Sequence, residues 1–227
     1  MTSFSSALSI ADRLTQIRQT LPKSVRLIAV TKQVSVEAIR AAYAAGVRDF
    51  GENRVQEAEA KQAQLQDLTD VTWHLIGHLQ SNKAAKALAQ FQWIHSVDSL
   101  KLAQRLDQLA AELPQKPKVC LQIKILPDPN KFGWSVPELL ADLPLLDQCR
   151  QLEIVGLMSI PPLGLDKADT QSVFSQTHNL AAQIRQQNWS HIRMEELSMG
   201  MSEDYQLAID SGATMIRLGR TLFGDRS

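Results

Sequence analysis

Eight short runs rich in apolar and β-branched residues alternate with longer helical stretches along almost the whole chain of 227 residues. This alternation is typical of an α/β fold with a parallel sheet. The runs predicted to form strands are residues 25–30, 49–50, 71–76, 92–97, 118–125, 152–158, 191–197 and 214–218. The helices predicted between them are residues 35–45, 52–66, 82–90, 99–112, 137–149, 169–187 and 203–211.

A count of eight strands, each followed by a helix, predicts a closed (β/α)8 barrel of the TIM type, which usually has about 250 residues. An open, doubly wound sheet is the alternative. Five glycines fall within or just past the predicted strand ends and favour the barrel; they are Gly51, Gly77, Gly156, Gly200 and Gly219. Because no linker or repeat divides the chain, we expect one domain over residues 1–227, beginning with an amphipathic N-terminal helix.

Charge and composition argue against several classes of partner. Lysine plus arginine and aspartate plus glutamate both total 24, so the formal net charge is zero. We therefore expect no nucleic-acid partner and no binding to an anionic membrane. Asp12 and Arg13 interrupt the first apolar stretch, which is unlike a signal peptide. Two cysteines, Cys120 and Cys149, form no disulfide framework, so we expect a cytoplasmic protein.

Motifs for common cofactors are missing from the sequence. The chain contains neither GxGxxG after its first predicted strand nor a GxxxxGK[ST] loop, which removes the usual support for dinucleotide or ATP binding. His74 and His78 are four residues apart, but they lie on a predicted strand and its exit loop. We expect them to be hydrogen-bonded histidines and predict no metal site.

Lys32 follows the first predicted strand directly, at the edge where barrel enzymes carry their active sites. A partly desolvated lysine amine has a lowered pKa and can attack an aldehyde to form a Schiff base. The alternative is a solvated lysine at the start of a loop.

The last two predicted strands end in residues suited to binding an anion. Hydroxyls and bare backbone amides occur in the segments 197–202, LSMGMS, and 217–221, RLGRT. In barrels a phosphate site is frequently built from the loops after strands seven and eight. Helix capping is the alternative role of Ser198 and Ser202.

Barrel closure would place the eighth strand beside the first, so Lys32 would face this anion site. A phosphorylated aldehyde uses both features, and pyridoxal 5′-phosphate (PLP) is the commonest cofactor of that kind. Arg217 and Gly219 can point inward from one strand face. A guanidinium opposite the pyridine nitrogen would keep that nitrogen unprotonated. A structural ion pair is the alternative role of Arg217.

Six blocks in order closely resemble the pyridoxal phosphate homeostasis family (YggS/PROSC type). They are residues 29–32, AVTK; 50–54, FGENR; 73–83, WHLIGHLQSNK; 156–159, GLMS; 197–202, LSMGMS; and 217–224, RLGRTLFG. The resemblance implies the barrel of alanine racemase without its second domain, and PLP held as an internal aldimine on Lys32. It also implies that a set of loop residues holds the phosphate, namely Ser198, Met199, Gly200, Ser202, Gly219 and Arg220.

The same resemblance places Arg217 at the ring nitrogen, Asn53 and Met158 beside the ring, and His78 near the mouth. Asn53 as a helix-start residue and Met158 as core filler are the alternatives. Residues 126–134 depart from the expected family pattern except at Lys131 and Gly133, and we assign that loop no role.

Racemisation of an amino acid needs two acid/base groups on opposite faces of the carbanion. The racemase takes its second base, a tyrosine, from the domain that this chain lacks, and neither Tyr43 nor Tyr205 is well placed on the predicted elements. We therefore expect a monomeric, non-catalytic protein that binds and buffers PLP and delivers it to apoenzymes. The alternatives are a weak PLP-dependent racemase and a lysine Schiff-base aldolase.

Overall fold

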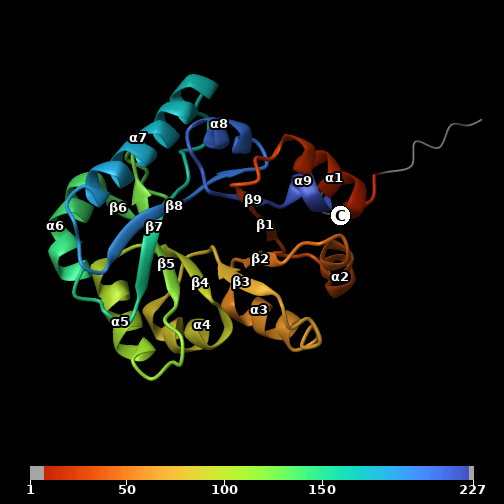
Figure 1. Cartoon of the computed structure of the whole chain (residues 1–227), viewed down its shortest axis with the longest axis horizontal. Helices are drawn as coiled ribbons and strands as arrows, with labels where there is room; N and C mark the ends of the chain where they lie inside the picture. The colour runs from red at the N-terminus through yellow and green to blue at the C-terminus, as the bar shows by residue number, and fades with distance from the viewer. Residues whose placement is uncertain (1–7, 225–227) are drawn as a thin grey trace, which may run out of the picture.

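The computed structural model describes residues 8–224, which form a closed barrel of parallel strands surrounded by helices (Figure 1). The strand order around the barrel is β4-β3-β2-β1-β9-β8-β7-β5, and pairing of β4 with β5 closes the ring. Its strands are β1 (Arg26–Val30), β2 (Asp49–Glu52), β3 (Thr72–Leu75), β4 (Trp93–Val97), β5 (Lys118–Lys124), β7 (Glu153–Ser159), β8 (Ile192–Met201) and β9 (Met215–Leu218). The prediction of a TIM-type (β/α)8 barrel is confirmed.

Helices cover the outside of the barrel. They are α1 (Ile10–Thr20), α2 (Val36–Ala44), α3 (Val55–Gln62), α4 (Ala84–Gln90), α5 (Leu100–Ala110), α6 (Val136–Leu146), α7 (Lys167–Arg185), α8 (Tyr205–Asp210) and α9 (Arg220–Phe223), with a 3₁₀ turn, η1, at Ser81–Lys83. Several begin where a side-chain oxygen accepts a bond from a free backbone N–H, as Ser35 does from Ala38 and Asp166 from Asp169. The expected N-terminal helix is α1; residues 1–7 lie outside the described part.

The seam between the first and last strands positions the candidate site. Ile28 pairs with Arg217 and Ala29 with Leu218, so the ends of β1 and β9 lie side by side. Helices α1 and α9 also contact each other there, so the first and last described helices lie on one side of the molecule (Figure 1). Lys32 and Gly219 therefore follow neighbouring strands at the same rim.

Three differences from the predicted elements bear on the site. Strand β2 continues to Glu52, so α3 starts at Val55 and not at residue 52. Strand β8 continues to Met201, four residues beyond its predicted end. A two-residue strand, β6 (Trp134–Ser135), pairs with β5 in the loop that was assigned no role.

Close packing of β7 on β8 depends on Gly156. A Cβ atom at this position would lie 1.7 Å from the backbone oxygen of Glu196, on the neighbouring strand. The barrel interior holds a separate apolar cluster that includes Ile28, Trp93 and Met158, while a larger cluster joins the strands to the outer helices. A packed interior leaves the rim as the place for a ligand.

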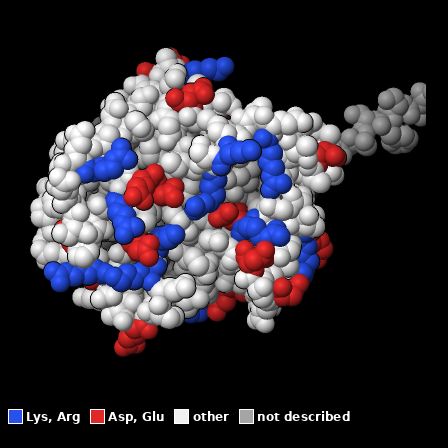
Figure 2. Space-filling model, viewed as in Figure 1, with Lys and Arg blue, Asp and Glu red and all other residues white. Residues whose placement is uncertain are grey.

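None of the helices in residues 8–224 has both the length and the apolar character needed to cross a lipid bilayer. Acidic and basic side chains lie next to one another over the face shown in Figure 2. This mixed surface agrees with the zero formal net charge.

Candidate functional site

A cavity of about 410 Å³ opens at the carboxyl ends of the strands around the β1–β9 seam. It is lined by Lys32, which follows β1, and by residues that follow β2, β8 and β9. Six of the predicted site residues line it, namely Lys32, Asn53, Ser202, Arg217, Gly219 and Arg220. The fold thus brings together a lysine amine and the polar groups of the last two strand ends.

The half-buried Lys32 shares the cavity wall with Val30, two residues earlier in the chain. Residues two apart on a strand face the same side, so the inward alternation of β1 continues to the lysine. Because β1 is packed in the barrel wall and Lys32 follows it on the inward side, the amine lies at the mouth of the barrel and is only partly buried.

Arg217 lies at the floor of the cavity and is only 4% exposed. Its Nη1 donates to Ser198 Oγ at 2.7 Å, and its Nη2 donates to the carbonyl oxygen of Ser159 at 3.1 Å. Burial lowers the pKa of Arg217 to about 10, while the charge of Asp204 acts in the opposite direction. The guanidinium is therefore protonated at neutral pH and can only donate hydrogen bonds to a ligand.

A row of hydrogen-bonded side chains continues from Arg217 down the barrel interior. Ser198 Oγ lies 2.7 Å from His95 Nδ1, and His95 Nε2 lies 2.9 Å from His74 Nδ1. His74 Nε2 lies 3.0 Å from a carboxylate oxygen of Asp49. Burial lowers the pKa of both histidines, so both are neutral at pH 7. These hydrogen bonds fix the orientation of the Ser198 hydroxyl, to which Arg217 donates.

The turns after β8 and β9, which also line the cavity, offer hydrogen-bond donors to an anion. Ser202 Oγ accepts a bond from the backbone N–H of Thr221 at 3.3 Å, so its hydroxyl hydrogen can donate to a ligand. Arg220 is exposed and pairs with Glu203 at the mouth. The carboxylate of Asp204 accepts from the backbone N–H of Met201 at 2.6 Å, which holds the turn after β8.

Four predicted site residues lie behind the cavity lining. Because β8 continues to Met201, Ser198 and Met199 alternate as strand residues. Ser198 faces the interior row, and Met199 packs in the outer core. Met158 is fully buried in the interior cluster, and Gly200, at φ +92°, packs against α8. Their contacts with a cofactor stay predictions.

The loop between β7 and α7 forms a large part of the cavity wall. The lining includes consecutive residues from Ile160 to Lys167. The residues Pro161 to Gly164 have the proline and glycine content of a loop, but nothing in this composition marks them as part of the site. Lys131, in the loop that was assigned no role, donates to the carbonyl oxygens of Ile160 and Pro161 and ties the two loops together.

His78 lies outside the residues that line the cavity. Its Nδ1 is 2.8 Å from Asp98, and its ring stacks on Phe132 with centroids 3.5 Å apart. A role near the mouth stays a prediction. The described residues hold no group of three or more histidine, cysteine or acidic side chains with metal-binding geometry.

The donor set fits PLP. The cavity lining combines the lysine amines of Lys32 and Lys167, the hydroxyl of Ser202 and the guanidiniums of Arg217 and Arg220. An amine suits an aldehyde, and the hydroxyl, guanidinium and bare amide of Gly219 suit a phosphate. A buried guanidinium at the floor can face a ring nitrogen that accepts a hydrogen bond.

Comparison with known proteins agrees with this donor set. Residues 6–227 match the family of the alanine racemase N-terminal domain. A protein of Synechocystis sp. named pyridoxal phosphate homeostasis protein is 54% identical over 211 residues, covering 93% of this chain and 96% of that protein. A Pseudomonas aeruginosa protein of the same name is 43% identical, with 90% and 86% covered.

Solved structures extend the agreement. PipY of Synechococcus elongatus PCC7942 with PLP bound superposes with a TM-score of 0.91 and 58% identity, covering 95% of this chain and 100% of PipY. Alanine racemase of Clostridium difficile is 16% identical with a TM-score of 0.76; the match covers 96% of this chain and 57% of the racemase, and shows a shared fold alone. On these matches the chain belongs to the pyridoxal phosphate homeostasis protein family.

Proposed function

We propose that this chain is a PLP-binding protein of intracellular PLP homeostasis, which binds, buffers and delivers the cofactor as a single-domain barrel over residues 1–227. Its effects on amino-acid and keto-acid pools are then indirect. The observation that carries the proposal is that Lys32, Arg217 and the Ser202 and Gly219 turns line one and the same cavity. The PLP bound to PipY supports it from a relative with 58% identity.

Lys32 is the covalent attachment point in this proposal. Its amine would be the nucleophile toward the cofactor's aldehyde carbon, and the aldehyde oxygen would leave as water. Ser202, Gly219 and Arg220 bind the phosphate, and Arg217 donates to the ring nitrogen. Asn53 lines the same cavity, and in this proposal it packs beside the ring.

The placement of the two tyrosines supports a non-catalytic role. Tyr43 Oη donates to Asp70 at 2.6 Å on the outer helical layer, and Tyr205 starts α8. Neither of these tyrosines, the only two in the chain, lines the cavity. The tyrosine expected as the second base of a racemase therefore has no counterpart in the cavity lining, which supports a non-catalytic role.

The covalent attachment is tested with Lys32→Ala. We expect the unmodified protein to be yellow with PLP and to give a borohydride-reduced adduct that maps to Lys32. The variant should give no adduct and keep the apo protein's melting temperature, because the residue lies at the rim. A reduced adduct at another lysine would contradict this assignment, and a sugar-phosphate adduct at Lys32 with no PLP adduct would favour an aldolase.

The carrier role is tested by transfer. We propose that the protein acts as a cytoplasmic monomer that releases PLP to PLP-dependent apoenzymes. The loaded protein is mixed with an apoenzyme, and recovery of its activity is compared with that given by the same concentration of free PLP. No recovery from the loaded protein would contradict delivery. Hydrogen exchange at the α-carbon of an amino acid faster than with free PLP would instead support the racemase alternative.

A further inference from the structure

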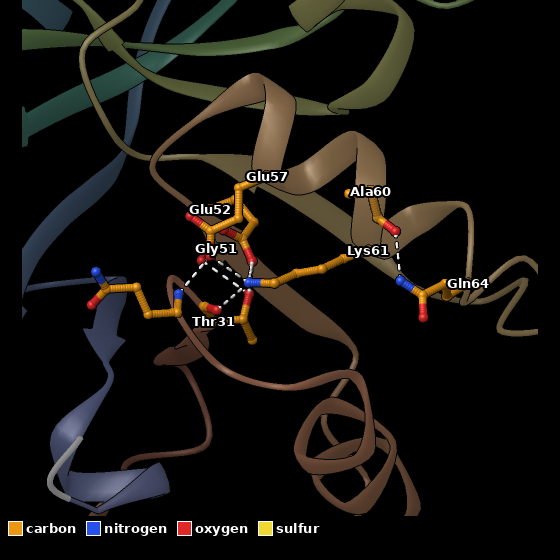
Figure 3. Close-up of polar contacts among 8 residues, drawn as sticks. Thr31, Gly51, Glu52, Glu57, Ala60, Lys61 and Gln64 are labelled. Carbon is orange, nitrogen blue, oxygen red and sulfur yellow. Dashed lines mark hydrogen bonds and ion pairs between the residues drawn. The ribbon is translucent and has the colours of Figure 1, made fainter. Parts of the chain in front are cut away.

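Lys61 is a buried lysine of α3 that the cofactor cavity does not use. The residue is 8% exposed, and its Nζ makes three contacts under the rim (Figure 3). It donates to the carbonyl oxygen of Thr31 at 2.5 Å and to carboxylate oxygens of Glu52 and Glu57, each at 2.7 Å. A buried ammonium with three acceptors holds its partners in a fixed arrangement.

The contacts of this cluster fall on both sides of Lys32. The Thr31 carbonyl belongs to the peptide that precedes Lys32, and Lys61 binds it. The backbone N–H of Gln33 belongs to the peptide that follows, and it donates to Glu57 Oε1 at 2.5 Å. Because Lys61 and Glu57 also pair with each other, one ion pair holds both peptides adjoining the lysine.

The backbone conformation of Gln33 is one that needs stabilising contacts. Gln33 has φ +59°, and Asn188 is the other non-glycine residue with a positive φ in residues 8–224. A side chain other than glycine adopts this conformation at a cost in free energy, so the surrounding structure must favour it. The hydrogen bond from the Gln33 N–H to Glu57 stabilises this backbone conformation.

Glu52 anchors the cluster from the barrel side. It is fully buried, and its Oε1 accepts from Thr31 Oγ1 at 2.6 Å as well as from Lys61. Its second oxygen is buried and has no hydrogen-bond partner among the described residues. Removing Lys61 would leave this carboxyl without its counter-charge, so a variant of Glu57 is the milder probe.

We propose that the Glu57–Lys61 pair is a positioning device that fixes the backbone on both sides of Lys32 and so presents its amine to PLP in a reactive arrangement. The inference rests on the proposed attachment of PLP to Lys32. Pre-ordering a reactive group removes entropy that the bond-forming step would otherwise lose. Glu57 and Lys61 would speed bond formation without contacting the cofactor.

The first test uses the apo protein and the exchange rate of the Gln33 amide hydrogen. Glu57→Leu should raise that rate about tenfold or more, the usual effect of losing a hydrogen bond to a charged group. Glu57→Gln keeps an oxygen acceptor and should stay near the unmodified protein. Glu59→Leu is the matched control, since Glu59 lies on the same helix, is 54% exposed and pairs only loosely with Lys86 at 3.6 Å.

The second test measures how fast PLP becomes trapped on Lys32 by borohydride. Glu57→Leu should slow trapping about tenfold, with Glu57→Gln and Glu59→Leu close to the unmodified rate. In a Lys32→Ala background, Glu57→Leu should leave the non-covalent dissociation constant of PLP unchanged. The proposal would be overturned if Glu57→Leu weakened non-covalent PLP binding in the Lys32→Ala background by as much as it slows trapping. It would also be overturned if Glu57→Leu left the exchange rate of the Gln33 amide unchanged.

The two tests separate this inference from the proposed function. If the unmodified protein traps no PLP on Lys32, the proposed attachment fails, whereas faster Gln33 exchange in Glu57→Leu still supports the backbone hold. If trapping on Lys32 is normal in every variant, the attachment stands and the positioning role fails.

Discussion

At the scale of single residues, the buried histidines give the molecule an acid-sensitive interior. Burial lowers the pKa of His95 well below its ordinary value of 6.5, and its interactions with the neighbouring His74 and with the positive charge of Arg217 add to the effect. The folded protein therefore keeps His95 neutral at a pH where the unfolded chain is protonated. Stability is lost as the pH falls below about 6.5, because the unfolded state then binds more protons.

We predict that the free energy of unfolding falls between pH 7.5 and pH 5.5, by up to about 1.4 kcal/mol per pH unit for each neutral histidine. His95→Gln should flatten this slope, since an amide can hydrogen-bond without titrating. Urea unfolding at several pH values measures it. Burial raises the pKa of Glu52 and Asp204, and these two groups make the folded state more stable as the pH falls. Because the unmodified protein and His95→Gln both contain these carboxyls, they do not affect the difference between the two slopes. An identical slope in the variant would contradict the assignment.

Where a strand end was placed correctly, the strand alternation predicted which residues face the cavity. Arg217 and Gly219 share a face of the last strand, and Lys32 continues the inward alternation of the first. Ser198 was misplaced relative to the rim because β8 runs on to Met201, past the point where its apolar run ends. The Glu52 cluster could not be foreseen, since a glutamate assigned to a helix start lies in a strand and meets a lysine nine residues later.

At the scale of the elements, the approach of β7 to β8 sets the width of the barrel beneath the site. Gly156 pairs with Glu196, and the register between the strands shifts just before this pair. A side chain here would overlap the backbone of β8. Because backbone cannot move aside as a flexible side chain can, the two strands would have to separate.

We predict that Gly156→Ala destabilises the protein by more than about 3 kcal/mol or prevents folding, as expected for severe overpacking in a core. Gly164→Ala is the matched control, because nothing lies within 4 Å of a Cβ atom there. Its φ of +82° makes a cost of about 1 kcal/mol the expectation. Urea unfolding of both variants measures the difference, and equal stability would show that the strands tolerate separation.

Helices and strands long enough to show a hydrophobic period could be predicted from the sequence, and very short ones could not. The alternation of strands and helices indicated the barrel and its closing seam, because periodicity carries that information. The two-residue strand β6 and the short helix α9 carry too few residues for any period. The loop after β7 was recognisable as a loop, but its contact with Lys131 joins segments about 30 residues apart.

At the scale of the whole molecule, a ligand in the cavity would join the first strand of the barrel to the last. Lys32 follows β1, Ser202 follows β8, and Gly219 follows β9. Among the strand pairings of the barrel, β1–β9 joins the residues with the largest separation along the chain. Contacts that close so long a loop cost the most entropy, so a ligand bound across this seam should favour the folded state of the entire barrel.

We therefore predict that PLP at about one hundred times its dissociation constant stabilises the protein by about 2.7 kcal/mol. For a domain of this size that corresponds to a rise of about 5–10 °C in melting temperature. Lys32→Ala should show a smaller rise at the same PLP concentration, because the phosphate contacts remain while the covalent bond is lost. Hydrogen exchange should slow in β1, β9 and α9 more than in β4, on the far side of the ring. An unchanged melting temperature would contradict binding across the seam, and protection spread evenly over all strands would contradict its location.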